Sequence, residues 1–136
     1  MKWHEADLEI RYADTDQMGV LHHASYVVYC EMGRIRMCAD LGLPYHELER
    51  DGIFMMVVDL TARFRAPGRY GERIYIKTAI RTLKKRLIEF VYEIRKRDGD
   101  LLLFSGSTKH LFSKGTEGTI TLPAHHLSLF QSWVDD

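Results

Sequence analysis

Hydrophobic and polar residues alternate along five stretches of the chain, with the period of two that is typical of a β-strand with one buried face. The first stretch lies near the N-terminus, where apolar side chains occupy every second position from Ala6 to Tyr12. The other four follow residue 53 and are separated by short segments. We predict β-strands at residues 4–12, 54–65, 72–83, 86–96 and 100–113.

A different period covers residues 24–41, where apolar side chains such as Tyr26, Cys30 and Met37 recur at steps of three and four. This spacing predicts an α-helix with a wide apolar surface, which other elements should surround. Gly33 lies in the middle of the helix, where glycine costs about 1 kcal/mol relative to alanine. We therefore expect a strand to approach the helix backbone there. Two shorter helices are predicted, at about 43–52 and 123–133.

The order of these elements indicates the fold. One strand and the long helix come first, and the four later strands are joined by short turns, which favour antiparallel pairing. Residues 13–20 follow neither period and are predicted to form a loop. A five-stranded antiparallel sheet that curls around one long helix accommodates all of these elements, so we predict a single α+β domain over residues 1–136. Its edge strands need covering, which predicts a homo-oligomer.

Composition limits the function. The chain has 136 residues, of which 46% are hydrophobic, and it has 19 basic and 19 acidic residues. This balance disfavours a general nucleic-acid-binding protein, whose affinity comes largely from excess positive charge. Cys30 and Cys38 lie about 12 Å apart along the predicted helix, too far for a disulfide. Reduced cysteines, with no signal-peptide pattern and no apolar run of membrane-spanning length, predict a soluble cytoplasmic protein.

One segment has an unusual composition and ends at the predicted helix start. It reads RYADTDQMGVLHH at residues 11–23 and is followed by Tyr26, Tyr29, Glu31 and Arg34. This segment resembles the N-terminal part of the 4-hydroxybenzoyl-CoA thioesterase family, in particular its bacterial acyl-CoA thioesterase branch with paired histidines. Residues 66–72, APGRYGE, resemble the turn between the second and third strands of that family. The resemblance covers nearly the whole chain and implies the hotdog fold, in which a five-stranded sheet wraps around one long central helix.

The resemblance implies an enzyme that hydrolyses acyl-CoA thioesters to a free acid and CoA. The catalytic carboxylate of the family falls on Asp16, and its companions in the paired-histidine branch fall on Tyr12 and His23. Asp16 would attack the thioester carbonyl or deprotonate a water molecule. The backbone N–H that polarises the carbonyl falls on His23 or its neighbour, where a helix N-terminus offers free donors and the positive end of its dipole.

The resemblance also implies residues that bind the substrate. The basic residues that contact CoA phosphates in the family fall on Lys84, Lys85 and Arg86, and clustered positive charge suits an anionic handle. If the assembly of the family holds, a dimer or tetramer, these residues serve the Asp16 of a neighbouring subunit. Ser25 stands where many relatives carry an asparagine that positions the carboxylate or water. No metal or cofactor is implied, because CoA is part of the substrate.

Structural interpretations of the same residues stay open at this stage. Asp14 and Asp16 are common residue types for capping turns and helices, and we expect a structural role for Asp14. His22 and His23 are possible metal ligands, but adjacent side chains diverge and no third ligand has supporting spacing. Lys84 to Arg86 either contact phosphates or form a solvated turn. Glu31 and Arg34 either line the site or form an ion pair with each other. Met55 and Met56 either line an acyl pocket or fill the core.

Two other functions compete with thioester hydrolysis. A hotdog hydratase or dehydratase needs an acidic residue on the helix, and Glu31 is available, but the segment from Asp14 to His23 favours the thioesterase. A non-catalytic acyl-CoA-binding protein on the same fold is the second alternative, and the presence of both Asp16 and His23 argues against it.

Overall fold

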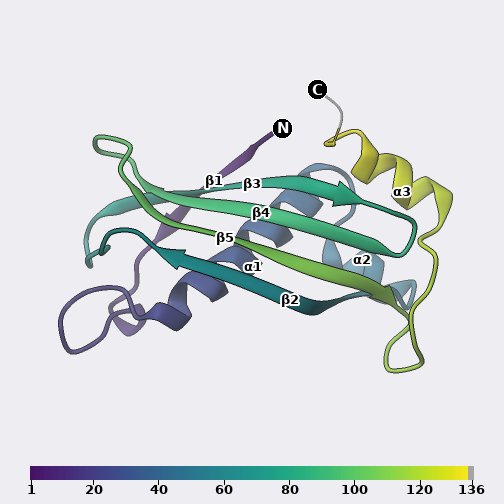
Figure 1. Ribbon diagram of the computed structural model, residues 1–136, viewed down its shortest axis with the longest axis horizontal. Helices are drawn as coiled ribbons and strands as arrows, with labels where there is room; N and C mark the ends of the chain where they lie inside the picture. The colour runs from purple at the N-terminus through teal and green to yellow at the C-terminus, as the bar shows by residue number, and fades with distance from the viewer. Residues whose placement is uncertain (135–136) are drawn as a thin grey trace.

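A computed structural model describes residues 1–134 (Figure 1). Its five strands form one antiparallel sheet, in the order β1-β3-β4-β5-β2, and the long helix α1 lies across one face of that sheet. This is the α+β hotdog arrangement that the sequence predicts. The elements are β1 (His4–Glu9), a 3-10 turn (Tyr12–Asp14), α1 (His23–Asp40), α2 (Tyr45–Arg50), β2 (Phe54–Phe64), β3 (Arg73–Leu83), β4 (Leu87–Lys96), β5 (Leu102–Ser113) and α3 (Ala124–Gln131).

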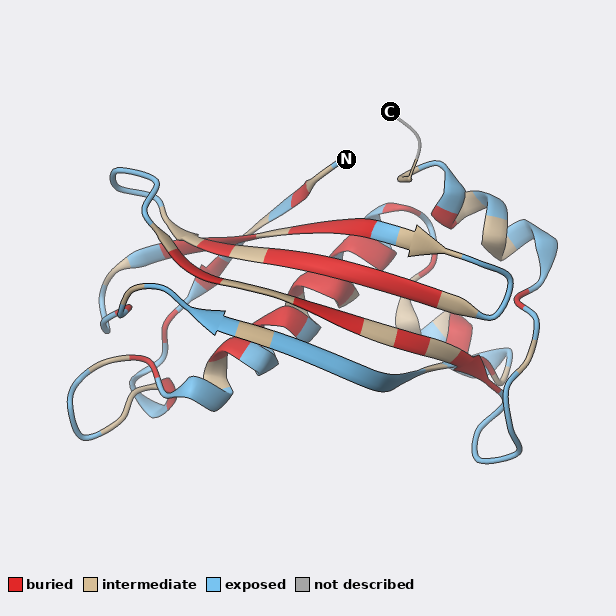
Figure 2. Cartoon of the chain, viewed as in Figure 1, coloured by how far each residue is buried: buried red, intermediate tan, exposed pale blue. Residues whose placement is uncertain are grey.

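The core lies between α1 and the concave face of the sheet. Buried residues are concentrated along β3, β4, β5 and the sheet-facing side of α1 (Figure 2). Gly33 is the point of closest approach, because a Cβ atom there would lie 2.7 Å from the Thr78 hydroxyl and 2.9 Å from Cδ1 of Ile76. The expected close approach of a strand to the helix backbone at this glycine is therefore confirmed.

The first strand is shorter than the sequence predicts. Strand β1 ends at Glu9, and the chain turns at Tyr12–Asp14 instead of continuing as a strand to residue 12. The Asp14 carboxylate causes this turn: it accepts hydrogen bonds from the Arg11 backbone N–H at 3.0 Å and from the Arg11 guanidinium at 2.8 Å. Tyr12 is consequently 79% exposed, and its predicted place on the buried face of the strand is wrong.

The burial predicted for the second strand is also wrong. Its apolar residues alternate in sequence as expected, but in the structure every residue of β2 is exposed or half-buried (Figure 2). This strand is an edge of the sheet and pairs only with β5 among the described residues. A register shift between Val57 and Asp59 interrupts that pairing. Strand β2 therefore presents an unpaired edge and apolar side chains on both faces.

A hydrogen-bonded polar chain crosses the core beside α1. Arg34 is buried and donates to the hydroxyl groups of Tyr45 at 2.9 Å and Tyr92 at 3.0 Å. Tyr92 is hydrogen-bonded to Thr108, whose hydroxyl lies 2.7 Å from Nε2 of His110. The two predicted roles of Arg34, in an ion pair with Glu31 or in the site wall, are therefore both wrong, because its guanidinium is directed into the core.

His110 makes the stability of the fold sensitive to acid. Burial lowers the pKa of His110 from its ordinary 6.5 to about 4, so between these values the unfolded chain binds a proton that the folded chain excludes. Stability is therefore full above about pH 6.5 and falls as the pH drops towards 4, by about 3 kcal/mol in total. Urea unfolding at a series of pH values should give a flatter pH dependence for His110→Gln than for the wild type.

The control for this measurement is His46→Gln, which replaces an exposed histidine of α2. It should keep the pH dependence of the wild type. An unchanged slope between pH 6.5 and 4 in His110→Gln would contradict the assignment, even if that variant is less stable at every pH.

Candidate active site

The loop between the 3-10 turn and α1 is folded back on itself by backbone hydrogen bonds. The Asp16 N–H donates to the Val20 carbonyl at 2.9 Å, and the Gly19 N–H donates to the Asp16 carbonyl at 3.0 Å. Gly19 has a φ of 78°, a conformation that favours glycine. The Leu21 N–H donates to the Gly68 carbonyl at 2.8 Å and ties this loop to the turn after β2. The loop therefore holds Asp16 beside the end of β2.

The two carboxylate oxygens of Asp16 have different surroundings. Oδ1 accepts from the Met18 N–H at 2.8 Å and from the Val20 N–H at 3.4 Å. Within residues 1–134, Oδ2 has no hydrogen-bond partner, and the residue is only half-buried. One oxygen thus fixes the orientation of the carboxylate, and the other is available to a substrate or water. The turn-capping interpretation of Asp16 is compatible with a chemical role for the second oxygen.

A hollow of about 380 Å³ lies beside this carboxylate, which we name the Asp16 hollow. The loop, the first turn of α1 and the end of β2 build it. Its apolar floor is held by aromatic contacts: Tyr26 stacks on Phe104 with centroids 5.3 Å apart and meets Phe64 edge-on at 5.4 Å. Burial raises the pKa of Tyr26, so this phenol is neutral at physiological pH. The lining residues are Asp16, Leu21, His23, Tyr26, Phe64, Arg65, Ala66 and Pro67.

The start of α1 leaves one backbone donor free beside the hollow. His22 is the N-cap, and its Nδ1 accepts from the Ala24 N–H at 3.1 Å. The Ser25 N–H donates to the His22 carbonyl at 2.9 Å. The His23 N–H has no hydrogen-bond partner in the described part of the chain. The uncapped N–H at the positive end of the helix dipole is therefore that of His23, a residue that lines the Asp16 hollow.

Other predicted residues support the loop instead of lining the hollow. Asp14 is buried, and it also accepts from the Tyr29 hydroxyl at 2.8 Å. Its hydrogen bond with Arg11 lowers the pKa of the Asp14 carboxyl, so it stays ionised as an anchor. The Ser25 hydroxyl donates to the Asp14 carbonyl at 2.9 Å and is thus engaged in loop structure. Tyr12 packs edge-on against Tyr70, at 5.7 Å between centroids, and does not line the hollow.

The basic turn lies at the other end of the molecule. Lys84, Lys85 and Arg86 are exposed in the hairpin between β3 and β4, whereas the Asp16 loop lies at the opposite end of the sheet (Figure 1). One chain therefore does not bring these residues to its own Asp16. The structure unites Asp16 with His23 and leaves the basic turn apart.

Six residues of the hollow were not among the predicted site residues: Leu21, Tyr26, Phe64, Arg65, Ala66 and Pro67. Tyr26 was assigned to the core side of the helix, and Phe64 and Arg65 were assigned to a strand. Arg65 places a positive charge at the rim, directly before the APG turn. Its position next to that turn is the only sequence signal that could have identified it, because contact between residues 16 and 64 depends on the tertiary fold.

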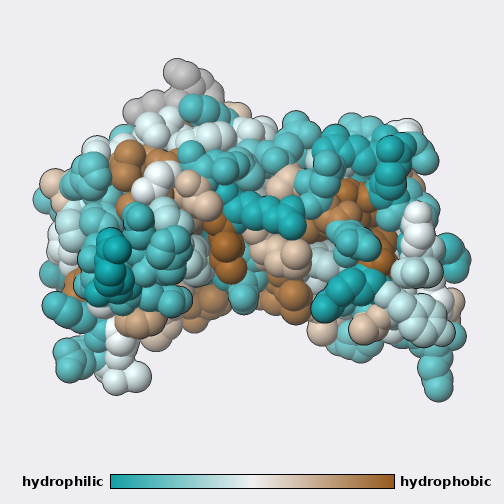
Figure 3. Space-filling view, turned by 180° about the vertical axis from the view of Figure 1, so that it is seen from behind, coloured by the Kyte–Doolittle hydropathy of each residue, from teal (hydrophilic) through white to brown (hydrophobic). Residues whose placement is uncertain are grey.

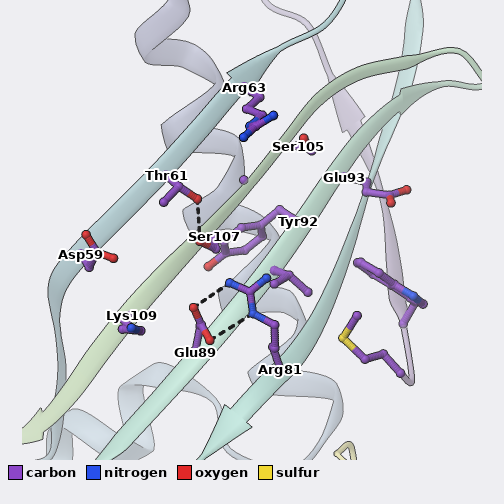
Figure 4. Close-up of a pocket in the computed structure, with 14 residues that line it drawn as sticks. Asp59, Thr61, Arg63, Arg81, Glu89, Tyr92, Glu93, Ser105, Ser107 and Lys109 are labelled. Carbon is purple, nitrogen blue, oxygen red and sulfur yellow. Dashed lines mark hydrogen bonds and ion pairs between the residues drawn. The ribbon is translucent and has the colours of Figure 1, made fainter.

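A larger hollow, of about 510 Å³, lies elsewhere, on the outer face of the sheet (Figure 4). Two of its charged groups are engaged with each other: Arg81 binds Glu89 at 2.7 Å, and this contact lowers the pKa of the Glu89 carboxyl. Thr61 and Ser107 share a hydrogen bond of 2.6 Å on its floor. No histidine, cysteine or helix start lines it. The Asp16 hollow is therefore the better candidate for chemistry.

The described residues contain neither a metal-binding cluster nor a membrane-spanning helix. Within residues 1–134, no group of three or more histidine, cysteine, aspartate or glutamate side chains is arranged to hold a metal ion. In the same part of the chain, no helix combines the length and apolar character needed to cross a membrane.

Comparisons with known proteins agree with the fold. A family model described as the thioesterase-like superfamily matches residues 10–134. The chain is 35% identical over 102 residues to YneP of Bacillus subtilis, and the match covers 75% of this chain and 74% of that protein. YneP is named as an acyl-CoA thioesterase on the basis of inference. It is 28% identical over 95 residues to the acyl-CoA thioester hydrolase YbgC of Escherichia coli O157:H7, covering 70% and 71% of the two chains.

Solved structures are also similar. A hypothetical protein from Thermus thermophilus superposes with a TM-score of 0.90 at 39% identity, covering 95% of this chain and 98% of that one. A DHNA-CoA thioesterase from Staphylococcus aureus superposes with a TM-score of 0.89 at 29% identity, covering 97% and 93%.

Proposed function

We infer that this chain, which belongs to the thioesterase-like superfamily, hydrolyses acyl-CoA thioesters to a free acid and CoA. The matched family and the relatives named for this activity support the reaction. The observation that carries the site assignment is that one hollow joins an oriented carboxylate oxygen of Asp16 and the unpartnered N–H of His23. These are the two groups that thioester hydrolysis requires, a nucleophile or base and a donor for the developing oxyanion.

The proposed reaction places the thioester carbonyl between these groups. The carbonyl oxygen accepts a hydrogen bond from the His23 N–H, which stabilises the negative charge of the tetrahedral intermediate. Asp16 either attacks the carbonyl carbon, which expels the CoA thiolate and leaves an anhydride that water cleaves, or removes a proton from the water that attacks. The His23 ring, which lines the hollow, is proposed to position water or to protonate the departing thiolate.

A panel of acyl-CoA esters tests this function directly. Release of the CoA thiol should be measured with acetyl-, octanoyl-, decanoyl- and benzoyl-CoA. Turnover of any of them supports hydrolysis, and no turnover with measurable binding would favour the non-catalytic acyl-CoA-binding alternative. The hydratase alternative has no structural support, because Glu31 is exposed and does not line the Asp16 hollow.

We also propose that two copies pair through the edges of their β2 strands. This edge offers unpaired backbone groups, and apolar side chains flank it: Val57 is 48% exposed and Leu60 is 43% exposed. Val28 of α1 is a further exposed apolar residue, at 51% exposure. Hydrophobic side chains gather along the lower margin of the molecule seen from behind, and the surface there is hollowed (Figure 3). A second copy is the self-complementary occupant for such an edge.

The proposed dimer brings the two ends of the molecule together. A two-fold axis pairs the β2 strands antiparallel, so the start of one β2 lies beside the end of the other. The Asp16 hollow lies at the end of β2, and the basic turn lies at the end of the sheet where β2 starts (Figure 1). Lys84, Lys85 and Arg86 of one subunit are thus proposed to contact the phosphates of a CoA bound at the partner's Asp16.

Removal of two charges from this turn should weaken binding of CoA. We expect the double variant Lys84→Ala, Lys85→Ala to raise KM for CoA esters at least about fivefold with little change in kcat. The phosphate contacts stabilise bound substrate and transition state equally, so their loss weakens binding without slowing the chemical step. Lys109→Ala, which removes a positive charge from the outer face of the sheet, is the matched control and should leave KM unchanged. An unchanged KM in the double variant would refute the phosphate contact.

A further inference from the structure

The hairpin between β3 and β4 does not hold its own loop in a favoured shape. Lys84 and Leu87 close the hairpin, because the Lys84 N–H donates to the Leu87 carbonyl at 2.8 Å and the Leu87 N–H donates back at 3.4 Å. Lys85 and Arg86 are left as a two-residue loop. The favoured loops of this length, types I′ and II′, need a positive φ at one or both residues. Neither Lys85 nor Arg86 has a positive φ, so the loop depends on contacts from outside the hairpin.

Two backbone donors from other parts of the chain bind this loop. The Leu122 N–H donates to the Lys85 carbonyl at 2.9 Å, and the Phe112 N–H donates to the Arg86 carbonyl at 3.1 Å. The charged side chains of both loop residues are exposed. These two hydrogen bonds therefore fix the backbone of the basic turn and leave its charges in contact with solvent.

The Leu122 donor belongs to the segment 119–134, which we name the C-terminal strap. The strap follows β5, passes the basic turn and continues into α3 (Figure 1). Before Leu122, the Ile120 N–H donates to the Phe112 carbonyl at 2.8 Å. After it, Phe130 of α3 is buried, with its ring centroid 6.2 Å from that of Phe112. Leu122 is itself buried, so its N–H is held against the turn from both sides.

We propose that the C-terminal strap is a positioning element for CoA: through the Leu122 N–H it holds the basic turn in the shape that binds the CoA phosphates. This inference rests on the proposed function and on the proposed phosphate contact of Lys84 to Arg86. A turn that is already ordered loses less conformational entropy when a phosphate binds, so preorganisation increases affinity. Leu122 is buried and acts on the substrate only through the turn. By linkage, bound phosphate must in return stabilise the docked strap.

Two substitutions at one position test this role. Leu122→Pro and Leu122→Ala both remove the buried leucine side chain, but only proline also removes the N–H that binds the Lys85 carbonyl. The proline variant should have a KM for octanoyl-CoA at least about threefold above that of the alanine variant, with kcat within about twofold. Octanoyl-N-acetylcysteamine carries the same thioester without the phosphates. Its kcat/KM should be the same in both variants.

This pair of substrates separates positioning from a general loss of structure. An equal KM for octanoyl-CoA in the two variants would overturn the inference. An equal loss on both thioesters in Leu122→Pro would also overturn it, because a damaged fold does not distinguish a CoA ester from a truncated one. A wild type that hydrolyses neither ester would refute the proposed function instead. An unchanged KM in the Lys84→Ala, Lys85→Ala variant would refute the phosphate contact.

Hydrogen exchange tests the coupling in the wild type, without any substitution. Saturating CoA should slow exchange of the Leu122 N–H at least about threefold, because a turn that binds phosphate favours the docked strap. Pantetheine, which lacks the phosphates, is the control and should leave this exchange rate unchanged. No protection by CoA, or equal protection by CoA and pantetheine, would show that the strap and the phosphate site are not coupled.

Discussion

Replacement of Asp16 by Asn or Ala is expected to lower kcat for acyl-CoA hydrolysis at least about a hundredfold, the scale of removing a principal catalytic group. In the wild type, the Met18 N–H donates to Oδ1 of Asp16 at 2.8 Å. The side-chain oxygen of Asn can accept the same hydrogen bond, so the turn should persist. The substitution removes the negative charge that attacks the carbonyl or deprotonates water. Thiol release under saturating substrate measures the effect, and circular dichroism checks that the fold is retained.

Asp14→Asn is the contrasting variant, because Asp14 is a buried anchor bonded to Arg11 and Tyr29. It should lower the melting temperature, since a charge-assisted hydrogen bond is weakened, whereas Asp16→Asn should lower turnover at nearly constant melting temperature. Unchanged turnover in both Asp16 variants would remove Asp16 from the mechanism. A single turnover in ¹⁸O-labelled water then separates the two routes, because only nucleophilic attack puts the label into the Asp16 side chain.

The fold was predictable from the sequence because side-chain periodicity reports directly on strands and helices. The five alternating stretches and the helical stripe at 24–41 correspond to the observed elements. The error at the end of β1 has a specific cause, since the side chain of Asp14 binds the backbone of Arg11 and turns the chain there. A hydrogen bond of this kind overrides alternation and leaves no periodic signal.

The error in β2 has a different origin. Alternation identifies the side chains that share a face, but it does not say whether that face meets a partner within the same chain. Phe54 and Phe64 are predicted to be buried and are 41% and 54% exposed, because the strand is an edge and no element of the described chain covers it. What reads as a buried strand in the sequence is thus an apolar edge in the single subunit.

The candidate site was predictable only in part, for a related reason. Asp16 and His23 are seven residues apart, so a loop that ends at a helix start brings them together locally. Phe64 and Arg65 join them through sheet pairing and the Leu21–Gly68 hydrogen bond, which a single sequence does not reveal. The basic turn at 84–86 reaches a reacting group only if a second subunit supplies it.

Replacement of Leu60 by Arg should therefore separate the subunits and remove most of the activity. Leu60 lies opposite Thr108 on the helix-facing side of β2 and is 43% exposed in one chain. The single subunit accommodates Arg there in contact with solvent, but the proposed dimer would bury an unpaired charge at a cost of about 3–5 kcal/mol. That cost raises the dissociation constant of the dimer at least about a hundredfold. Light scattering should give half the molecular mass of the wild-type dimer, and kcat/KM for decanoyl-CoA should fall at least about tenfold relative to the wild type.

Thr61→Arg separates this effect from the added charge itself. Thr61 is the next residue of the same strand and lies on the outer face, where it is hydrogen-bonded to Ser107. An Arg at this position stays in solvent in the proposed dimer, so the mass and the activity of the wild type should be retained. If Leu60→Arg remains dimeric, the subunits do not pair through β2. If it becomes monomeric with full activity, each chain holds a complete site, and the basic turn of the partner takes no part in the reaction.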